Sequence, residues 1–390
     1  MDLKPLPFRS TLEQYQKQAE ALLEAHASGD SQAIRVFHKN HPRFLDSETK
    51  WLPKNLPESE IQSAALELAD AQLTIARWYD FQSWPALVQY VDEVTRDGSP
   101  TFQFESAVEA VITGNLAALE SLLPENPELV RARSTRINNF DPPVHRATLL
   151  HYIAANGVEG YRQKTPANAV EIAKTLLTAG AEVDALADMY GGQYATMSML
   201  VSSCHPAQAG VQVALVETLV DFGAAVEARG SDKWGSPLMT ALAFGYRDAA
   251  EALVRRGARI DNLAAAVGLG RIAEATQLLA TADSETRHRA LALAAQHGHV
   301  EIVRLLLDAG EDPSRYNPDG NHSHSTPLHQ AIAGSHDAAV RLLVERGARL
   351  DIKDRIYQST PLGWAIYLGK TEIEKYLRAQ GAKTSAELGQ

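Results

Sequence analysis

Histidines are the residues in this chain with the clearest capacity for chemistry. Seven of the 13 histidines lie within residues 288–336, and His322 and His324 are separated by a single residue. In an extended segment, that spacing places both imidazoles on the same side. Two neutral imidazoles can hold a metal with a third ligand such as Asp319 or His297, and near neutral pH they can exchange protons. The alternative is a polar turn in which both rings have structural or solvated roles.

We therefore take His322, His324 and His297 as candidate catalytic residues. We expect the first two rings to point into a groove within reach of His297 or Arg162. Replacing both rings with Ala or Gln is then expected to cost under about 0.5 kcal/mol of stability, because surface turns tolerate change. The H-x-H pattern alone does not establish a metal site, and the sequence implies no cofactor.

Two further polar groups could take part in chemistry. Arg162 and Gln163 lie in a polar segment, where a guanidinium could hold a carboxylate or phosphate in a bidentate manner, or could simply be solvated. Cys204 beside His205 resembles a thiol nucleophile and its base, but adjacent residues at a helix end point in different directions. The sequence contains no phosphate-binding Gly-Lys-Ser/Thr loop, no H-E-x-x-H and no G-x-S-x-G motif.

Composition narrows the function. The 390 residues carry a formal net charge of −11, which argues against nucleic acid as a partner. Apolar runs such as residues 264–267 are too short to span a membrane, and the N-terminal segment has no apolar signal region. A single cysteine excludes an internal disulfide and fits a reducing, cytoplasmic location.

Internal repeats then indicate the elements that position these residues. Residues 326–336 read TPLHQAIAGSH and residues 360–369 read TPLGWAIYLG, 34 positions later. Each is followed by an apolar run with helical spacing that ends in Gly-Ala. Similar units precede them along the chain, with starts near residues 105, 148, 195, 236, 261, 289, 326 and 360.

These units resemble the ankyrin repeat, which has about 33 residues, two antiparallel helices and a T-P-L-H-x-A start. The resemblance implies an all-α fold, an ankyrin-repeat solenoid of about eight helix–turn–helix repeats with turn arms. It also implies that His329 and His151, at the fourth position of the start, form structural hydrogen bonds to the backbone. Gly180, Gly257 and Gly347 are expected to end helices in a left-handed conformation.

The residues before the repeats predict a separate helical module. We expect domains at residues 1–97 and 105–384, joined by a linker at 98–104 and followed by a tail at 385–390. Within the first domain, capping signals predict helices ending near His26, Asn40 and Val94, and one long helix from Ser59 to Tyr79. The aromatic residues of this module should form its core or its contact with the first repeat: Trp78, Tyr79, Phe81 and Trp84. The FQSWPAL stretch resembles a module that precedes ankyrin repeats in bacterial proteins, which suggests a bacterial origin.

Departures from the repeat length indicate insertions. The inserts occupy residues 158–168, 189–194, 205–212 and 314–325, and we expect them to project to one side. Two shortened repeats within residues 261–288 predict a tight middle of the stack. Long inserts in a compact unit are more often functional than not.

The resemblance also implies a concave face on which partners bind. A protein partner bound there by a monomeric chain is the favoured function, and an enzyme or small-molecule binder with a pocket roofed by the inserts is the alternative. The candidate binding residues are Tyr152, Asn156, Arg162, Gln163, Tyr190, Ser203, His205, Phe244, Tyr316, Asn317, Trp364 and Tyr367.

Overall fold

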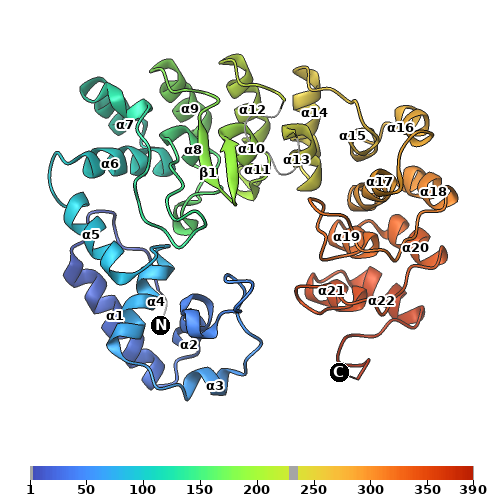
Figure 1. Cartoon of the computed structure of the whole chain (residues 1–390), viewed down its shortest axis with the longest axis horizontal. Helices are drawn as coiled ribbons and strands as arrows, with labels where there is room; N and C mark the ends of the chain where they lie inside the picture. Colours follow the sequence, from blue (N-terminus) through green and yellow to red (C-terminus); the bar gives the residue numbers. More distant parts are fainter. Residues whose placement is uncertain (1–2, 228–235, 390) are drawn as a thin grey trace. The chain divides into compact units, whose positions relative to one another are not determined.

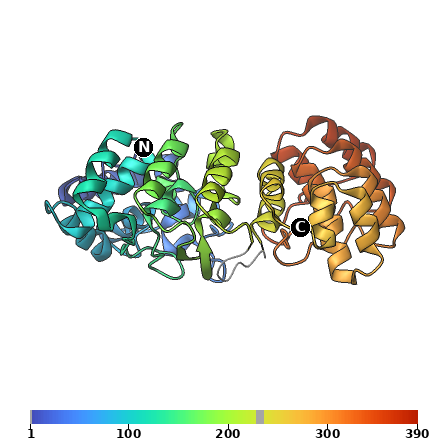
Figure 2. The same ribbon diagram turned by 90° about the horizontal axis from the view of Figure 1, so that it is seen from above.

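The computed structural model describes residues 3–227 and 236–389. These residues divide into two compact units, one ending at Ala225 and the other starting at Val226. Each unit consists almost entirely of helices, as the sequence predicts (Figure 1, Figure 2). In the part of the chain that is described, no helix is both long enough and apolar enough to cross a membrane.

The first unit begins with five helices, α1 to α5. Their bounds are Leu12–Ala27, Ser31–Asn40, Glu58–Gln62, Leu68–Trp78 and Trp84–Val94. Thr11 and Gln14 form a capping box at α1, Asp30 caps α2 and Ser83 caps α5, so capping signals start these helices as the sequence predicts.

One prediction for this module is wrong. The single long helix expected from Ser59 is two helices, α3 and α4, separated by residues 63–67. Glu67 and Asp70 form a reciprocal capping box that starts α4 anew. A side chain that satisfies free backbone N–H groups favours a helix start over continuation.

The aromatic residues of the module form its core, as predicted. Tyr79 and Phe81 are buried, and Trp78 and Trp84 pack against the same apolar cluster. Tyr161 packs against it too, although it comes from the insert at residues 158–168. The core of the module is therefore completed by a segment that belongs to the repeats.

The linker predicted at residues 98–104 is largely helical. Ser99 caps helix α6, Pro100–Thr113, and Pro100 occupies its first turn, where a missing N–H costs nothing. Helix α5 packs against α6. The division between compact units falls near residue 225 instead of residue 97, so the module and the first repeats form one unit.

Three repeats complete the first unit, each with an inner and an outer helix. The pairs are α6 with α7 (Leu116–Glu125), α8 (Leu149–Ile153) with α9 (Ala169–Thr178), and α10 (Thr196–Leu200) with α12 (Gln212–Asp221). The insert at residues 205–212 contributes to the short helix α11, Cys204–Gln208.

A two-stranded antiparallel sheet precedes α10, and helix patterns do not predict it. Strands β1, Leu186–Met189, and β2, Gly192–Ala195, are joined by Tyr190 and Gly191, whose φ angles are 51° and 75°. Two positive φ angles in a two-residue loop match the right-handed twist of the strands. The insert predicted at residues 189–194 is the tip of this hairpin.

The second unit contains five helix pairs in succession (Figure 1). The pairs are α13 (Pro237–Ala243) with α14 (Arg247–Arg255), α15 (Leu263–Gly268) with α16 (Ile272–Leu279), α17 (Ser284–Gln296) with α18 (Val300–Asp308), α19 (Pro327–Ala333) with α20 (Asp337–Glu345), and α21 (Pro361–Tyr367) with α22 (Thr371–Ala379). Together with the first unit, the described residues contain the eight predicted repeats.

Local signals in this unit act as the sequence predicts. Thr326 and His329 form a capping box at α19 with Pro327 in the first turn, and His329 Nε2 also donates to the carbonyl of Ser359. Gly257 and Gly347 have φ angles of 102° and 89° just after outer helices. In the first unit, His151 likewise bonds Thr148 and the carbonyl of Tyr194, so both structural histidines are confirmed.

Candidate functional site

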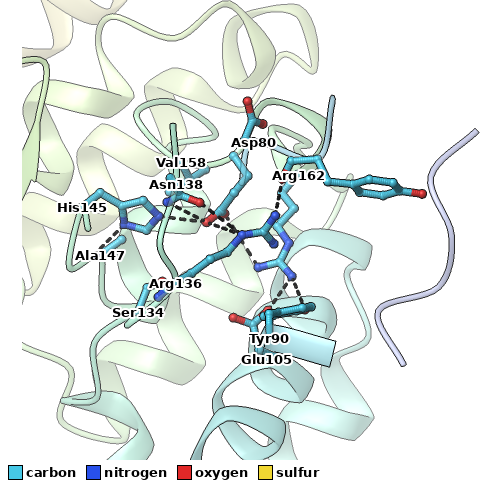
Figure 3. A network of polar contacts seen from close by, with 12 residues as sticks. Asp80, Tyr90, Glu105, Ser134, Arg136, Asn138, His145, Ala147, Val158 and Arg162 are labelled. Atoms are coloured by element: carbon cyan, nitrogen blue, oxygen red, sulfur yellow. Dashed lines mark hydrogen bonds and ion pairs between the residues drawn. The ribbon is translucent and has the colours of Figure 1, made fainter. Parts of the chain in front are cut away.

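A network of buried charges links the N-terminal module to the first repeats (Figure 3). Its middle is Glu159, whose carboxylate lies 3.0 Å from His145 Nε2 and 3.6 Å from Arg136 Nε. His145 Nδ1 accepts the amide N–H of Ala147, so the ring carries its proton on Nε2 and donates it to Glu159. All three charged or polar side chains are almost completely withdrawn from solvent.

Arg162 forms the second half of the network. Its Nη2 donates to Glu105 at 2.5 Å and to the Tyr90 hydroxyl at 3.0 Å, and that hydroxyl donates onward to Glu105. Its Nη1 lies 3.7 Å from Glu159. Two buried arginines thus face two buried glutamates, which compensates the charges that burial would otherwise disfavour.

The pKa values of the network follow from this arrangement. Burial alone would raise the pKa of the Glu159 carboxyl, but His145 and the two arginines hold it well below its ordinary range. Burial raises the pKa of the Tyr90 and Tyr152 hydroxyls, and the negative glutamates add to that effect. Glu159 is therefore ionised and both tyrosines are neutral near pH 7.

The network joins the N-terminal module to the repeats. Arg136 donates to the backbone carbonyl of Tyr79 and to the Tyr161 hydroxyl at 2.7 Å, and its guanidinium lies 3.7 Å from the centre of the Phe81 ring. Asp80 accepts the amide N–H of Gly160 at 2.7 Å, and burial raises its pKa to about 6. The residues come from the module, from the 133–147 segment and from the insert.

This network has the character of a structural centre. Two of the predicted binding residues belong to the network. Arg162 is 2% exposed and binds Glu105 instead of facing a ligand. Tyr152 is fully buried and donates its hydroxyl hydrogen to Glu159. Gln163 donates to the carbonyl of Val158. The sequence suggested a solvated or ligand-binding arginine because its partner at residue 105 is 57 positions away.

The other predicted residues of the first unit lie around the hairpin. Asn156 donates to Ser202 at 2.8 Å and accepts from the hydroxyl of Tyr190, which is 54% exposed. Ser203 is buried and donates to the carbonyl of Ala155. His205 is partly buried at the start of α11. The structure brings Asn156 and Tyr190 together as one polar contact.

In the second unit, two of the candidate catalytic histidines meet at the end of α13. His297 Nε2 donates to the carbonyl of Leu242 and His322 Nε2 donates to the carbonyl of Ala243, both at 2.8 Å. Burial lowers the pKa of His297 to about 4 and also lowers that of His322. These rings are therefore neutral donors that add hydrogen bonds to carbonyls at the end of α13.

The shortened repeat explains how they reach α13. Gln296 Nε2 also donates to the carbonyl of Ala243, although α15 and α16 lie between α13 and α17 in the sequence. The repeat formed by α15 and α16 is short enough for the end of α17 and the arm bearing His322 to contact α13. These hydrogen bonds agree with the close packing predicted for the shortened repeats within residues 261–288.

The third candidate, His324, lies in a different setting. Its Nδ1 is 3.8 Å from a carboxylate oxygen of Asp354, and its ring centre is 5.9 Å from that of Trp364 and 6.2 Å from that of His322. Asp354 is fully buried and accepts from the Trp364 indole N–H at 3.0 Å and from the amide of Tyr357. Burial alone would raise the pKa of Asp354, but the hydrogen bonds it accepts hold it well below its ordinary range.

The remaining predicted residues of this unit surround the arm at residues 314–325. Tyr316 donates its hydroxyl to the carbonyl of Lys353, and Asn317 is buried against Ser325. Phe244 stands edge-on to His322, with ring centres 6.3 Å apart. Within residues 3–227 and 236–389, no cluster of three or more His, Cys, Asp or Glu side chains could hold a metal ion.

An exposed row of aromatic residues distinguishes the last repeat. Tyr357 is 63% exposed, Tyr367 is 89% exposed, and the half-buried Trp364 lies between them in the sequence. Ile366 and Leu368, beside Tyr367, are also exposed. We call Tyr357, Trp364, Ile366, Tyr367 and Leu368 the aromatic strip. The repeat pattern predicts Trp364 and Tyr367 as binding residues but not Tyr357, which lies in the arm outside the inner helix.

Comparisons with known proteins agree with the repeat architecture. A family model for ankyrin repeats (3 copies) matches residues 262–354 and 316–387. The chain is 31% identical over 220 residues, 54% of its length, to the ankyrin repeat and KH domain-containing protein mask-1 of Caenorhabditis elegans. It is 32% identical over 108 residues, 26% of its length, to the NF-kappa-B inhibitor cactus of Drosophila yakuba.

These matches cover 8% of the first relative and 22% of the second. The human ASB11 ankyrin repeat domain aligns with 72% of this chain and 97% of its own, at 22% identity and a TM-score of 0.36. Residues 262–387 are thus ankyrin repeats, and the helix pairs form an all-α ankyrin-repeat solenoid.

Proposed function

We propose that this chain is a protein-binding module and that the aromatic strip of the last repeat is part of its binding surface. The observation that carries the proposal is the exposure of Tyr357 and Tyr367, at 63% and 89%, beside exposed Ile366 and Leu368. Tyrosine and tryptophan are enriched among the residues that dominate binding energy at protein interfaces.

The position of the strip supports the same function. Trp364 and Tyr367 belong to α21, the inner helix of its repeat, and Tyr357 belongs to the arm that precedes it. Inner helices and arms form the concave surfaces with which solenoid proteins bind their partners. Asp354 connects α21 to the arm, because its carboxylate accepts hydrogen bonds from the Trp364 indole and from the backbone amide of Tyr357.

A photo-crosslinking residue placed at position 367 tests this function. In cells that produce the chain, we expect ultraviolet light to yield a discrete adduct with a second protein. The same residue at position 272 is the matched control, because Ile272 is 48% exposed but lies on an outer helix, α16. Equal adducts from both positions, or none from position 367, would contradict the proposal.

A small-molecule or enzymatic role is the second candidate, and one observation favours it. His324 is 21% exposed and faces the buried carboxylate of Asp354, the geometry by which a carboxylate orients an imidazole. A thermal-shift screen would detect such a ligand, since saturation at 100 times its Kd adds about 2.7 kcal/mol of stability. His324→Gln should abolish that shift.

The sequence supports three further proposals about the setting of this function. The FQSWPAL stretch suggests a bacterial origin, and the single cysteine, Cys204, fits a cytoplasmic location. The third proposal is a monomeric state. Sedimentation of the purified chain over a range of concentrations tests the monomer directly.

A further inference from the structure

We propose that the partner segment bound by the aromatic strip is an acidic peptide with apolar side chains. This inference rests on the proposed function and adds the chemical class of the partner. It depends on the charges around the strip.

The last repeat is basic in an acidic protein. Residues 352–389 carry six Lys or Arg and four Asp or Glu, whereas the whole chain carries 37 and 48. The acidic side chains of this repeat are all engaged internally. Asp354 is buried and hydrogen-bonded, Glu372 pairs with Lys375, and Glu374 and Glu387 both pair with Arg378.

The remaining cations of the repeat have no carboxylate partner among the described residues. They are Lys353, Arg355, Lys370 and Lys383. Lys353 and Arg355 precede Tyr357 within the arm, and Lys370 follows Tyr367 by three residues. Along the sequence, these cations without a carboxylate partner therefore lie both before and after the aromatic strip.

Arg355 is held in a form that suits a carboxylate. Its side chain is exposed, and its guanidinium lies 4.1 Å from the centre of the Tyr316 ring. A guanidinium that stacks on an aromatic face keeps the N–H groups along its edge free, and that edge matches a carboxylate in a bidentate manner. Tyr316 is itself fixed, because its hydroxyl donates to the carbonyl of Lys353 at 2.6 Å.

The apolar part of the peptide follows from the strip itself. Tyr357 and Trp364 both lie beside His324, with ring centres 6.3 Å and 5.9 Å from its ring, so the arm and α21 present one connected aromatic surface. Tyr367 lies one helical turn beyond Trp364 in α21. In the proposed complex, acidic side chains of the peptide pair with the cations before and after the aromatic strip, and its apolar side chains cover the aromatic rings between these cations.

Nucleic acid also combines negative charge with stacking surfaces, but the chain as a whole disfavours it. A net charge of −11 repels a continuous phosphate backbone, whereas a short acidic peptide needs complementarity only at the last repeat. A second copy of this chain is the third candidate occupant.

Selection from a displayed library of random dodecapeptides on the full chain tests the inference. We expect the enriched peptides to combine Asp or Glu with aromatic or leucine residues, and synthetic versions to bind less tightly as salt increases. Enriched peptides that are neutral or basic would overturn the acidic partner and leave the proposed function intact. Tighter binding of a single-stranded oligonucleotide than of any peptide, or dimerisation that blocks the peptides, would also overturn it.

Variants identify the surface. Lys353→Glu with Arg355→Glu should weaken the selected peptides at least tenfold at low salt, and Arg355→Lys should retain part of the affinity. Arg304→Glu is the matched control, because it reverses one exposed charge on the outer helix α18. Peptides that keep their affinity in Tyr367→Ala would contradict both the inference and the proposed surface. Retained affinity in the double charge reversal alone would contradict only the acidic partner.

Discussion

The guanidinium of Arg162 donates to the carboxylate of Glu105 at 2.5 Å, and both side chains are at least 97% withdrawn from solvent. Glu105 belongs to α6, and Arg162 belongs to an insert 57 residues later. This pair holds the insert against the first repeat, and Tyr90 attaches the N-terminal module to the same pair.

Arg162→Met should therefore destabilise the chain strongly. Removing one member of a buried pair leaves an uncompensated charge and typically costs about 3–5 kcal/mol. Urea denaturation measures the loss. Arg341→Met is the matched control, because the Arg341–Asp337 pair is about half exposed and exposed pairs contribute little to stability. Similar losses in the two variants would show that Arg162 and Glu105 do not form the buried pair described.

Stability should depend on pH between about 4 and 6.5. Burial lowers the pKa of His151, His297 and His329 to about 4, whereas an unfolded histidine titrates near about 6.5. The unfolded chain binds more protons than the folded chain in this pH window. The free energy of unfolding therefore rises with pH and decreases as the pH falls from about 6.5 to about 4. For the fully buried His151, the effect is on the order of 3 kcal/mol.

Asp80 should oppose that trend. Burial raises its pKa to about 6, so the folded chain binds the extra proton and stability falls as pH rises from about 4 to 6. Asp80→Asn should then make the loss of stability at acidic pH steeper, and His151→Gln should make that loss shallower. Denaturation at about pH 7 and about pH 5 measures both variants. An unchanged pH dependence in either variant would contradict the assigned burial.

His322→Ala should lower the free energy of unfolding by more than the sequence predicts for a solvated turn. A solvated turn would tolerate the change at under about 0.5 kcal/mol, but His322 Nε2 donates to the carbonyl of Ala243 at 2.8 Å. Gln296 Nε2 still donates to this carbonyl in the variant, so the loss is that of one hydrogen bond, about 0.5–1.5 kcal/mol. Chemical denaturation of His322→Ala, with His205→Ala as a control on a partly buried histidine elsewhere, gives the difference. Equal stability of the two variants would favour the solvated turn.

The N-terminal module should be required for the first repeats to fold. A fragment of residues 98–227 lacks Tyr79, Asp80 and Tyr90 and leaves Arg136 and Arg162 with fewer partners. A fragment of residues 1–227 keeps the complete network and should unfold cooperatively, as followed by circular dichroism. We expect the shorter fragment to aggregate. A soluble, cooperative 98–227 fragment would show that the module is dispensable.

Local signals allowed much of the fold to be predicted. Thr326, Pro327 and His329 determine a helix start within four residues, and Gly347 determines a helix end by its own conformation. The break between α3 and α4 was missed because Glu67 is not among the usual capping residues, although it forms a capping box with Asp70.

The polar centres could not be predicted in this way. Asp80 and Gly160 are 80 residues apart, and His322 and Ala243 are 79 apart. No local pattern indicates such pairs, because they depend on how repeats stack and on how far an insert bends. Tyr367, by contrast, is among the residues that the ankyrin resemblance places on the concave face, so its exposure could be anticipated.

The Glu159 network also constrains the order in which the chain acquires structure during synthesis. The module at residues 1–97 emerges from the ribosome first, yet Tyr79, Asp80 and Tyr90 receive their partners from residues 136–162. At about 5–20 residues per second, this delay lasts several seconds. During that interval the nascent module exposes the face that Tyr161 later covers, which is the kind of surface that chaperones bind.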